Sequence, residues 1–240
     1  MIMDNYDQYL SGHLAKQSGA QAITDKLQSI RANYKEFLPA DQSAAVLEIG
    51  PGTGELLRYL TVEAGLRNVT AIDRSAEVAA FCSERYCQTM HVEDPIRFLA
   101  EHGGQYDLII LLHVLEHVEK SNTVPFLGAI HSALRPGGRV IIEVPNMANP
   151  LVGLTWRYTD FTHETGFTGT SLAYALRLAG FATVSVRPVR IPTCSLPRIA
   201  QFVLRGCLEF SMRMLTRLYV RTVEINSANL TGIGTRAAAT

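Results

Sequence analysis

A strand-like apolar run that ends in a glycine-rich turn is the strongest chemical signal in the sequence. In VLEIGPGTG, residues 46–54, the glycines Gly50, Gly52 and Gly54 alternate with other residues and lead directly into a helical pattern. Glycines at this spacing permit a sharp turn and leave room for a ligand against the main chain. The spacing is G-x-G-x-G, and it differs from the G-x-G-x-x-G turn of nicotinamide enzymes. It therefore predicts a ligand with no pyrophosphate on the helix N-terminus.

An acidic residue ends the next strand-like run. Asp73 closes VTAID, twenty-three residues after Gly50. A carboxylate at this position of an α/β sheet can accept both hydroxyls of a ribose. The glycine turn and Asp73 together predict a site for a nucleoside-containing cofactor.

A second group of reactive side chains lies in TWRYTDFTHETGF, residues 155–167. A histidine close to a carboxylate suits a general base near neutral pH, so we expect His163 to be the base or an acceptor contact, with Asp160 orienting its ring. The alternative is that both residues fix the loop and cap the helix after it. His117, in HVLEHVEK, is the second candidate base. The residues expected to contact the acceptor are Trp156, Arg157, Tyr158 and Phe167.

The elements that must position these residues alternate between strand and helix. Apolar runs predict strands at 44–50, 69–73, 87–92, 106–113 and 139–145. Helical patterns separate them at 55–65, 75–86, 95–103 and 121–138, the last ending in a Gly-Gly stop. This alternation predicts an α/β fold with a mostly parallel sheet.

The rest of the chain extends this core on both sides. Cap helices are expected within 13–38, and a long loop at 146–169. Further elements are expected as a helix at 170–181, a strand at 182–191, a helix at 196–221 and an edge strand at 229–237. We expect one domain over 1–240, with cap helices in 1–43, the core in 44–145 and the acceptor side in 146–240.

Composition excludes several classes of function. The 240 residues are 47% hydrophobic, which excludes general disorder, and 22 basic residues balance 22 acidic ones, so no global positive field attracts nucleic acid. The four cysteines lack the CxxC spacing of a metal site, so we expect free thiols and no metal. They are Cys82, Cys87, Cys194 and Cys207. No signal peptide or membrane span is visible, so a cytoplasmic location is expected.

Five segments of the chain carry a resemblance to a known family. They are LEIGPGTG, AID, VEDPIRFL, YDLIILLHVLEHV and LRPGGRVIIEVPN. In these segments the chain resembles class I S-adenosylmethionine (SAM) dependent methyltransferases of the ubiquinone-biosynthesis O-methyltransferase-like group. The resemblance implies a Rossmann-like, seven-stranded sheet with SAM at the carboxyl ends of the strands. It implies that Asp73 holds the ribose and that Asp94, rather than Glu93, bonds the adenine amino group. Asp94 before Pro95 is also a helix start signal. The residues implied to flank the methionine and methyl side are Glu48, Gly50, Gly52, Gly54, His113, Val114 and Leu115.

A narrower resemblance concerns the acceptor. The Y-x-D-x-T-H pattern and the SLAYALRLAGF helix are similar to methyltransferases of bacterial polysaccharide and O-antigen synthesis. This resemblance implies a carbohydrate hydroxyl as acceptor, on a glycan or on a lipid-linked or nucleotide-linked sugar. Two alternatives stay open, an O-methyltransferase of a small aromatic or quinone-like metabolite and a catalytically silent SAM-binding module.

The helical stretch 196–221 is amphipathic. Its arginines fall within one arc, opposite Leu204, Leu208, Met212, Leu215, Leu218 and Tyr219. The arginines are Arg198, Arg205, Arg213, Arg217 and Arg221. One interpretation is a lid or homodimer helix that packs its apolar face on protein. The other is a basic amphipathic surface for an anionic membrane or a glycan-assembly partner.

Overall fold

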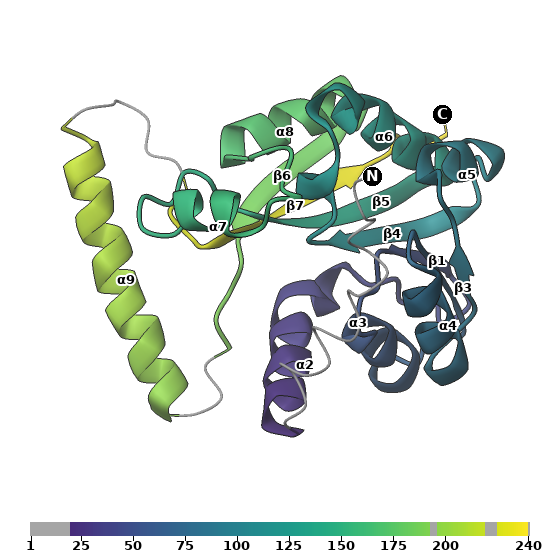
Figure 1. Ribbon diagram of the computed structural model, residues 1–240, viewed down its shortest axis with the longest axis horizontal. Helices are drawn as coiled ribbons and strands as arrows, with labels where there is room; N and C mark the ends of the chain where they lie inside the picture. The colour runs from purple at the N-terminus through teal and green to yellow at the C-terminus, as the bar shows by residue number, and fades with distance from the viewer. Residues whose placement is uncertain (1–19, 193–195, 219–224, 240) are drawn as a thin grey trace.

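The computed structural model describes residues 20–192, 196–218 and 225–239, which fold around one seven-stranded sheet (Figure 1). The strands are β1 (Ala45–Ile49), β2 (Asn68–Asp73), β3 (Thr89–His91), β4 (Tyr106–Leu112), β5 (Leu134–Pro145), β6 (Thr183–Pro188) and β7 (Asn229–Thr235). Their order is β3-β2-β1-β4-β5-β7-β6. Every pairing is parallel except the two that β7 makes with β5 and β6. The predicted Rossmann-like sheet is confirmed.

Helices cover both faces of the sheet because the strand side chains alternate between two apolar cores. Leu47, Ile109 and Leu111 lie in one core, with buried side chains of α6 and α8. Val46, Leu108 and Ile110 lie in the other, with α2, α3 and α4. The helices are α2 (Ala20–Tyr34), η1 (Lys35–Phe37), α3 (Glu55–Arg58), the π turn η2 (Tyr59–Glu63), α4 (Ala76–Arg85), α5 (Pro95–Glu101), η3 (Leu115–His117), α6 (Lys120–Ala133), α7 (Gly153–Thr159), α8 (Gly169–Leu178) and α9 (Leu196–Thr216).

Two predicted boundaries are wrong for identifiable reasons. The helix expected at 121–138 ends at Ala133, and its Gly-Gly pair belongs to the irregular start of β5, where the register with β4 shifts. A side chain at Gly138 would lie 3.1 Å from the Tyr106 carbonyl oxygen of β4, so Gly138 permits close strand packing, whereas Gly137 has a positive φ of 80° with open space around it. The loop expected at 146–169 contains the two-turn helix α7.

The carboxyl ends of the parallel strands meet at one edge of the sheet, which places the predicted site residues together. The chain leaves β1 toward β2 on one side, whereas β4 lies on the other side of β1. This arrangement is a topological switch point, where α/β sheets bind their ligands. Gly50, Asp73, Asp94 and His113 all stand at or just after the carboxyl end of a strand on this edge.

The more protected positions of α9 are mainly polar, whereas its large apolar side chains other than Met212 are exposed. Figure 1 shows α9 at one end of the molecule, beside α7. Arg198 forms an ion pair with Asp25 of α2 at 2.6 Å, and Arg205 pairs with Glu209 at 2.7 Å. In α9 only Met212 is buried. The interpretation of this helix as a lid that packs its apolar face on the chain is therefore wrong, whereas its role as a homodimer helix stays a prediction. Tyr219, Arg221 and Cys194 lie outside the described residues, while Cys82, Cys87 and Cys207 are free thiols as predicted.

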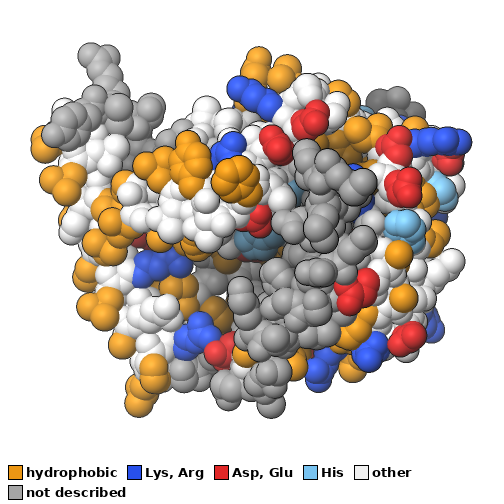
Figure 2. All heavy atoms as spheres, in the orientation of Figure 1, with side chains coloured by type: hydrophobic (Ala, Val, Ile, Leu, Met, Phe, Trp, Pro, Cys, Tyr) orange, Lys and Arg blue, Asp and Glu red, His pale blue; other side chains and the backbone are white. Residues whose placement is uncertain are grey.

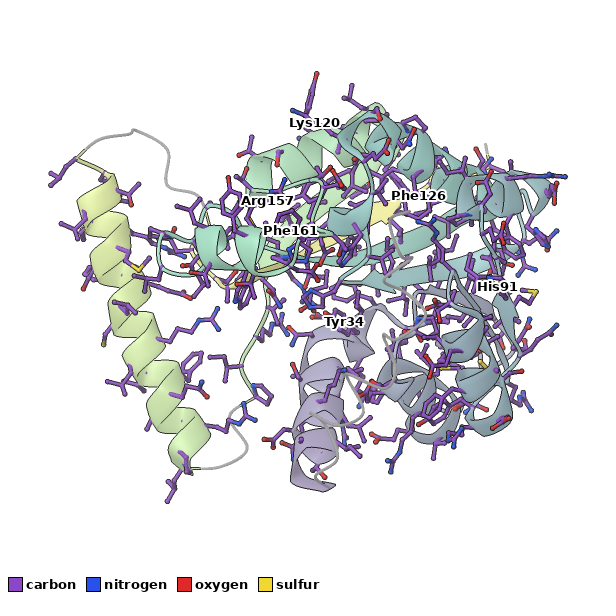
Figure 3. All side chains as sticks on the ribbon, viewed as in Figure 1. Tyr34, His91, Lys120, Phe126, Arg157 and Phe161 are labelled. Carbon is purple, nitrogen blue, oxygen red and sulfur yellow. The ribbon has the colours of Figure 1, made fainter. Side chains whose placement is uncertain are left out.

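A buried carboxylate in β5 fastens α2 to the sheet. Glu143 accepts hydrogen bonds from the Tyr34 hydroxyl and from Asn229 Nδ2, the latter at 2.7 Å. Figure 3 shows Tyr34 at the end of α2 that approaches the sheet. Burial raises the pKa of Glu143 to about 7, although the bond from Asn229 acts in the opposite direction. The folded protein therefore holds a proton on Glu143 more tightly than the unfolded chain does.

This pKa predicts a specific loss of stability with rising pH. The free energy of unfolding should fall as the pH rises from the ordinary glutamate pKa of 4.5 to about 7, because ionising Glu143 then opposes folding. In the wild type this free energy should fall by on the order of 3 kcal/mol across the range, and in Glu143→Gln this fall should be absent. Urea unfolding at several pH values measures the effect. A constant stability difference between variant and wild type would contradict it, and the exposed Glu84→Gln serves as control.

Candidate functional site

The glycine turn between β1 and α3 has the conformation that its residues predict. Gly50, Gly52 and Gly54 have positive φ angles of 72°, 55° and 80°. An added Cβ would lie 2.5 Å from Cγ2 of Val114 at Gly50, and 2.3 Å from the Tyr86 ring at Gly54. Both torsion and space therefore require glycine at these two positions.

Beside this turn, Glu48 of β1 carries a polar atom that lacks a protein partner. Its side chain is buried, and no described residue hydrogen-bonds its Oε2. Burial and the neighbouring Glu55 carboxylate raise the pKa of Glu48 well above its ordinary value. A buried carboxylate oxygen without a donor is costly, so the site suits a ligand that brings an N–H or O–H group. SAM carries N–H and O–H groups that could donate to Glu48, so the residues of this turn fit a cofactor of this type.

The two predicted aspartates differ in their surroundings. Asp73 ends β2, and burial raises its pKa to about 6 although the Ser75 N–H, at 2.7 Å, donates to its Oδ1. Asp94 is exposed and caps α5 by accepting from Arg97 N–H at 3.0 Å. The helix-start role of Asp94 is thus confirmed, whereas its adenine contact stays a prediction.

His113 occupies an unusual position after β4. It is the only non-glycine residue in the described ranges with a positive φ, at 57°. Its Nδ1 lies 3.2 Å from Glu116 Oε1, and its Nε2 lies 3.2 Å from Glu143 Oε1. The imidazole is therefore held between two carboxylates while 47% of its side chain stays exposed. The sequence placed His113 here but did not reveal Glu143, which is hidden within the apolar run of β5.

The neighbours of His113 do not all line an open site. Leu115 is fully buried and packs in the core, and its predicted place on the methyl side stays a prediction. Phe167 is likewise buried, with 3% of its surface exposed, and packs in the same core instead of offering a surface to an acceptor. Both residues fix the backbone of the segments that carry the site.

The segment after β5 brings two histidines together. His163 Nδ1 lies 2.8 Å from the Trp156 carbonyl oxygen, and His117 Nδ1 lies 2.8 Å from Thr162 Oγ1. The two rings stand edge to face with centroids 4.8 Å apart. Burial lowers the pKa of His117, and the nearby His163 lowers it further, although the Glu116 carboxylate opposes this.

Asp160 supports a different histidine from the one predicted. Its Oδ1 accepts from Thr162 N–H at 2.8 Å and from the Thr162 hydroxyl at 2.6 Å. Because that hydroxyl already donates to Asp160, its oxygen is left to accept from His117. The expectation that Asp160 orients the His163 ring is therefore wrong, since the Trp156 carbonyl does so. Burial opposes the ionisation of Asp160, but the bonds from Thr162 outweigh it and lower its pKa.

A cavity of about 390 Å³ gathers residues from four segments at this edge. Its lining residues are His113, Pro145, Trp156, Thr159, Asp160, His163 and Asn229. Three predicted acceptor-side residues meet here, whereas Arg157 and Tyr158 are absent from the lining. The Arg157 guanidinium instead donates to the carbonyls of His163 and Glu164, and thereby fixes the loop (Figure 3).

The residues Glu116, His117 and His163 could also hold a metal ion. One ligating atom from each lies within 4.8 Å of the others, and Glu116 Oε2 is buried without a partner among the described residues. The sequence had predicted no metal, because the cysteine spacing gave no sign of one. The histidines come from segments 46 residues apart, so their meeting was not visible in the sequence.

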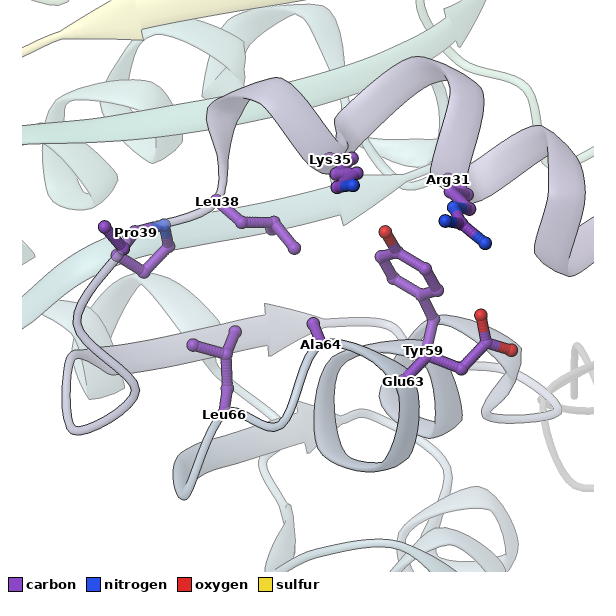
Figure 4. A pocket seen from close by; sticks show the side chains of 9 residues that line it. Arg31, Lys35, Leu38, Pro39, Tyr59, Glu63, Ala64 and Leu66 are labelled. Carbon is purple, nitrogen blue, oxygen red and sulfur yellow. The ribbon is translucent and has the colours of Figure 1, made fainter.

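A larger hollow of about 570 Å³ lies elsewhere (Figure 4). It is lined by Arg31 and Lys35 of the cap helices, by Tyr59 and Glu63 of the π turn, and by segments that precede β1 and β2. It therefore stands at the amino ends of these strands. Ligands of open α/β sheets bind at the opposite, carboxyl edge. We accordingly place the functional site at the smaller cavity.

Known proteins share both the sequence pattern and the fold. Ubiquinone biosynthesis O-methyltransferase of Rickettsia bellii is 30% identical over 139 residues, which cover 54% of this chain and 56% of that protein. Malonyl-[acyl-carrier protein] O-methyltransferase of Pectobacterium atrosepticum is 28% identical over 69% of this chain and 65% of its own length. The chain thus spans little more than half of the first relative.

Solved structures and a family profile complete the comparison. A SAM-dependent methyltransferase of Archaeoglobus fulgidus superposes with a TM-score of 0.67 at 19% identity, over 95% of this chain and 100% of that one. A Haloferax volcanii methyltransferase, solved in complex with its Trm112 activator, superposes with a TM-score of 0.69 at 15% identity, over 98% and 99% of the two chains. Residues 23–186 match the family profile described as Methyltransferase domain. The chain therefore belongs to the methyltransferase domain family, whose cofactor is SAM.

Proposed function

We propose that this chain is a SAM-dependent O-methyltransferase and that its acceptor is a carbohydrate hydroxyl, on a glycan or on a lipid-linked or nucleotide-linked sugar. The observation that supports this acceptor is the composition of the 390 Å³ cavity. One aromatic ring, Trp156, stands there beside the carboxylate of Asp160, the amide of Asn229 and two imidazoles. Sugars are held by this combination of an apolar ring face and hydrogen-bonding groups.

The cofactor side of the site is formed by the carboxyl ends of β1 and β2. SAM, when bound, supplies a methyl group activated by a positively charged sulfur. The unpartnered Oε2 of Glu48 accepts from a donor of the cofactor, and the glycine turn permits the close approach of its main chain. Asp73 accepts from ribose hydroxyls.

The acceptor side must align the hydroxyl and remove its proton. The Trp156 carbonyl can only accept, so the proton of a neutral His163 ring lies on Nδ1 and the lone pair on Nε2. The same reasoning places the lone pair of His117 on Nε2, because the Thr162 oxygen accepts at Nδ1. His163 lines the cavity, so its Nε2 is the base that takes the hydroxyl proton, and His117 is the second candidate.

Two other functions remain alternatives. The curated relatives named above are O-methyltransferases of ubiquinone biosynthesis and of malonyl-[acyl-carrier protein], which favours a quinone-like or other small metabolite as acceptor. An aromatic metabolite is best held in an apolar pocket without charged groups, whereas this cavity contains Asp160 and two histidines. A catalytically silent SAM-binding module would leave these polar side chains without a chemical role. Methyl transfer from labelled SAM to glycan, quinol and acyl-carrier acceptors separates the three.

One prediction of the proposed function concerns the cofactor. Asp73→Ala should weaken SAM binding by about 1.5–3 kcal/mol, because it removes a charge-assisted hydrogen-bonding group. Isothermal titration calorimetry measures the affinity. Asp41→Ala is the matched control, since Asp41 lies at the opposite edge of the sheet and bonds only locally to Ser43. Equal SAM affinity in both variants would remove Asp73 from the site.

The second prediction concerns the proton. His163→Ala should lower single-turnover methyl transfer at saturating SAM by on the order of 10²–10⁴, the usual contribution of a positioned base. SAM affinity should stay nearly unchanged, because His163 lies on the acceptor side.

Asp160→Asn and His117→Ala complete this test. Asp160 acts on His117 through Thr162, so these two variants should resemble each other more than either resembles His163→Ala. Wild-type turnover and an unchanged acid limb of the pH profile in His163→Ala would refute its role as base. Loss of wild-type turnover on adding a chelator would instead assign the Glu116, His117 and His163 group to metal binding.

A further inference from the structure

We propose that the outward apolar face of α9 docks on an anionic phospholipid bilayer. We define the outward face by its exposed large side chains. These are Leu196, Ile199, Phe202, Val203, Leu204, Leu208, Phe210, Met214 and Leu215. The proposal does not depend on the acceptor or on the catalytic residues.

The orientation of α9 is the reverse of that of an ordinary surface helix. Its more protected positions carry Arg198, Arg205 and Glu209, whose charges are paired, together with Met212. A helix of a water-exposed protein usually turns its apolar stripe to the core. Here the side chains of that stripe are exposed, and Figure 2 shows apolar side chains along this flank. An apolar surface of this extent marks an interaction site.

A second apolar group lies beside α9. The helix α7 and the turns on either side of it expose Leu151, Leu154, Tyr158 and Phe161, with Phe161 98% exposed. In Figure 1, α7 lies between α9 and the sheet. The apolar side chains of α7 therefore lie near the cavity, which Trp156 of the same helix lines.

The charge of α9 favours an anionic lipid surface over a second copy of this chain. Residues 196–218 contain four arginines and one glutamate. Arg213 and Arg217 are exposed, and neither forms an ion pair with another described residue. Two such helices packed in parallel would bring these like charges together, whereas an anionic bilayer attracts them. A broad apolar face flanked by arginines is typical of helices that lie in the membrane interface.

The dimensions fit a helix lying flat on the bilayer and not one that crosses it. No helix in the described parts of the chain is long and apolar enough to span a membrane. The insertion that carries α9 leaves the sheet after Pro188 and returns at Asn229, which lines the cavity.

Vesicle flotation of the full chain tests the proposal. Vesicles of phosphatidylcholine with phosphatidylglycerol should float the protein at low salt, whereas pure phosphatidylcholine should float much less of it. Arg213→Gln with Arg217→Gln should weaken binding to the anionic vesicles roughly 30-fold, since each arginine near such a surface contributes about fivefold. The same pair should also reduce the dependence of binding on salt.

Matched apolar variants complete the test. Leu204→Gln, Phe210→Gln and Leu215→Gln together should abolish flotation while the melting temperature stays unchanged, because all three side chains are exposed. The control combines Val62→Gln, Tyr174→Gln and Leu178→Gln, which are similarly exposed on other elements and should leave flotation unchanged. Equal flotation of both triple variants, or a wild-type dimer that the α9 triple variant dissociates without any vesicle binding, would overturn the proposal.

Discussion

The close contact between the turns after β1 and β4 is the constraint on which the site depends. These two strands are neighbours, yet the chain leaves them toward opposite sides of the sheet, so no helix separates their turns. Gly50 lies against Val114 at a distance that leaves no space for a side chain. Through this contact the cofactor turn and the segment that carries His113 are placed relative to each other. Any residue other than glycine at position 50 would push them apart.

Two buried glutamates at the same edge illustrate how such a site divides its polar groups. Glu143 has partners within the protein, from Tyr34 and Asn229, and its role is to join α2 and β7 to the centre of the sheet. Glu48 has an oxygen with no partner among the described residues. Burial of the Glu48 oxygen without a hydrogen-bond donor costs desolvation energy, whereas the donors to Glu143 offset that cost. A bound ligand with a donor group would offset it at Glu48.

The sequence predicted the sheet well because each strand is a compact apolar run between helical patterns. It predicted the glycine turn because positive φ angles require glycine, and a φ angle is a property of the single residue that adopts it. It did not predict that Trp156, and not Asp160, orients His163, since the short helix α7 decides which groups face each other. It also could not tell which side of α9 faces inward. Amphipathic spacing separates two faces, but it does not say which of them has a partner.

The segment that carries α9 is inserted between two strands whose ends are neighbours, and this position allows its length and sequence to change. The excursion begins and ends at Pro188 and Leu230, which are paired neighbours on adjacent antiparallel strands. Its two ends are thus already together, so lengthening or replacing it adds little closure entropy and shifts no strand register. Such a segment is free to vary while the glycine turn after β1 and the segment that carries His163 remain fixed. A surface on this insertion can therefore evolve separately from the residues at the carboxyl ends of the strands.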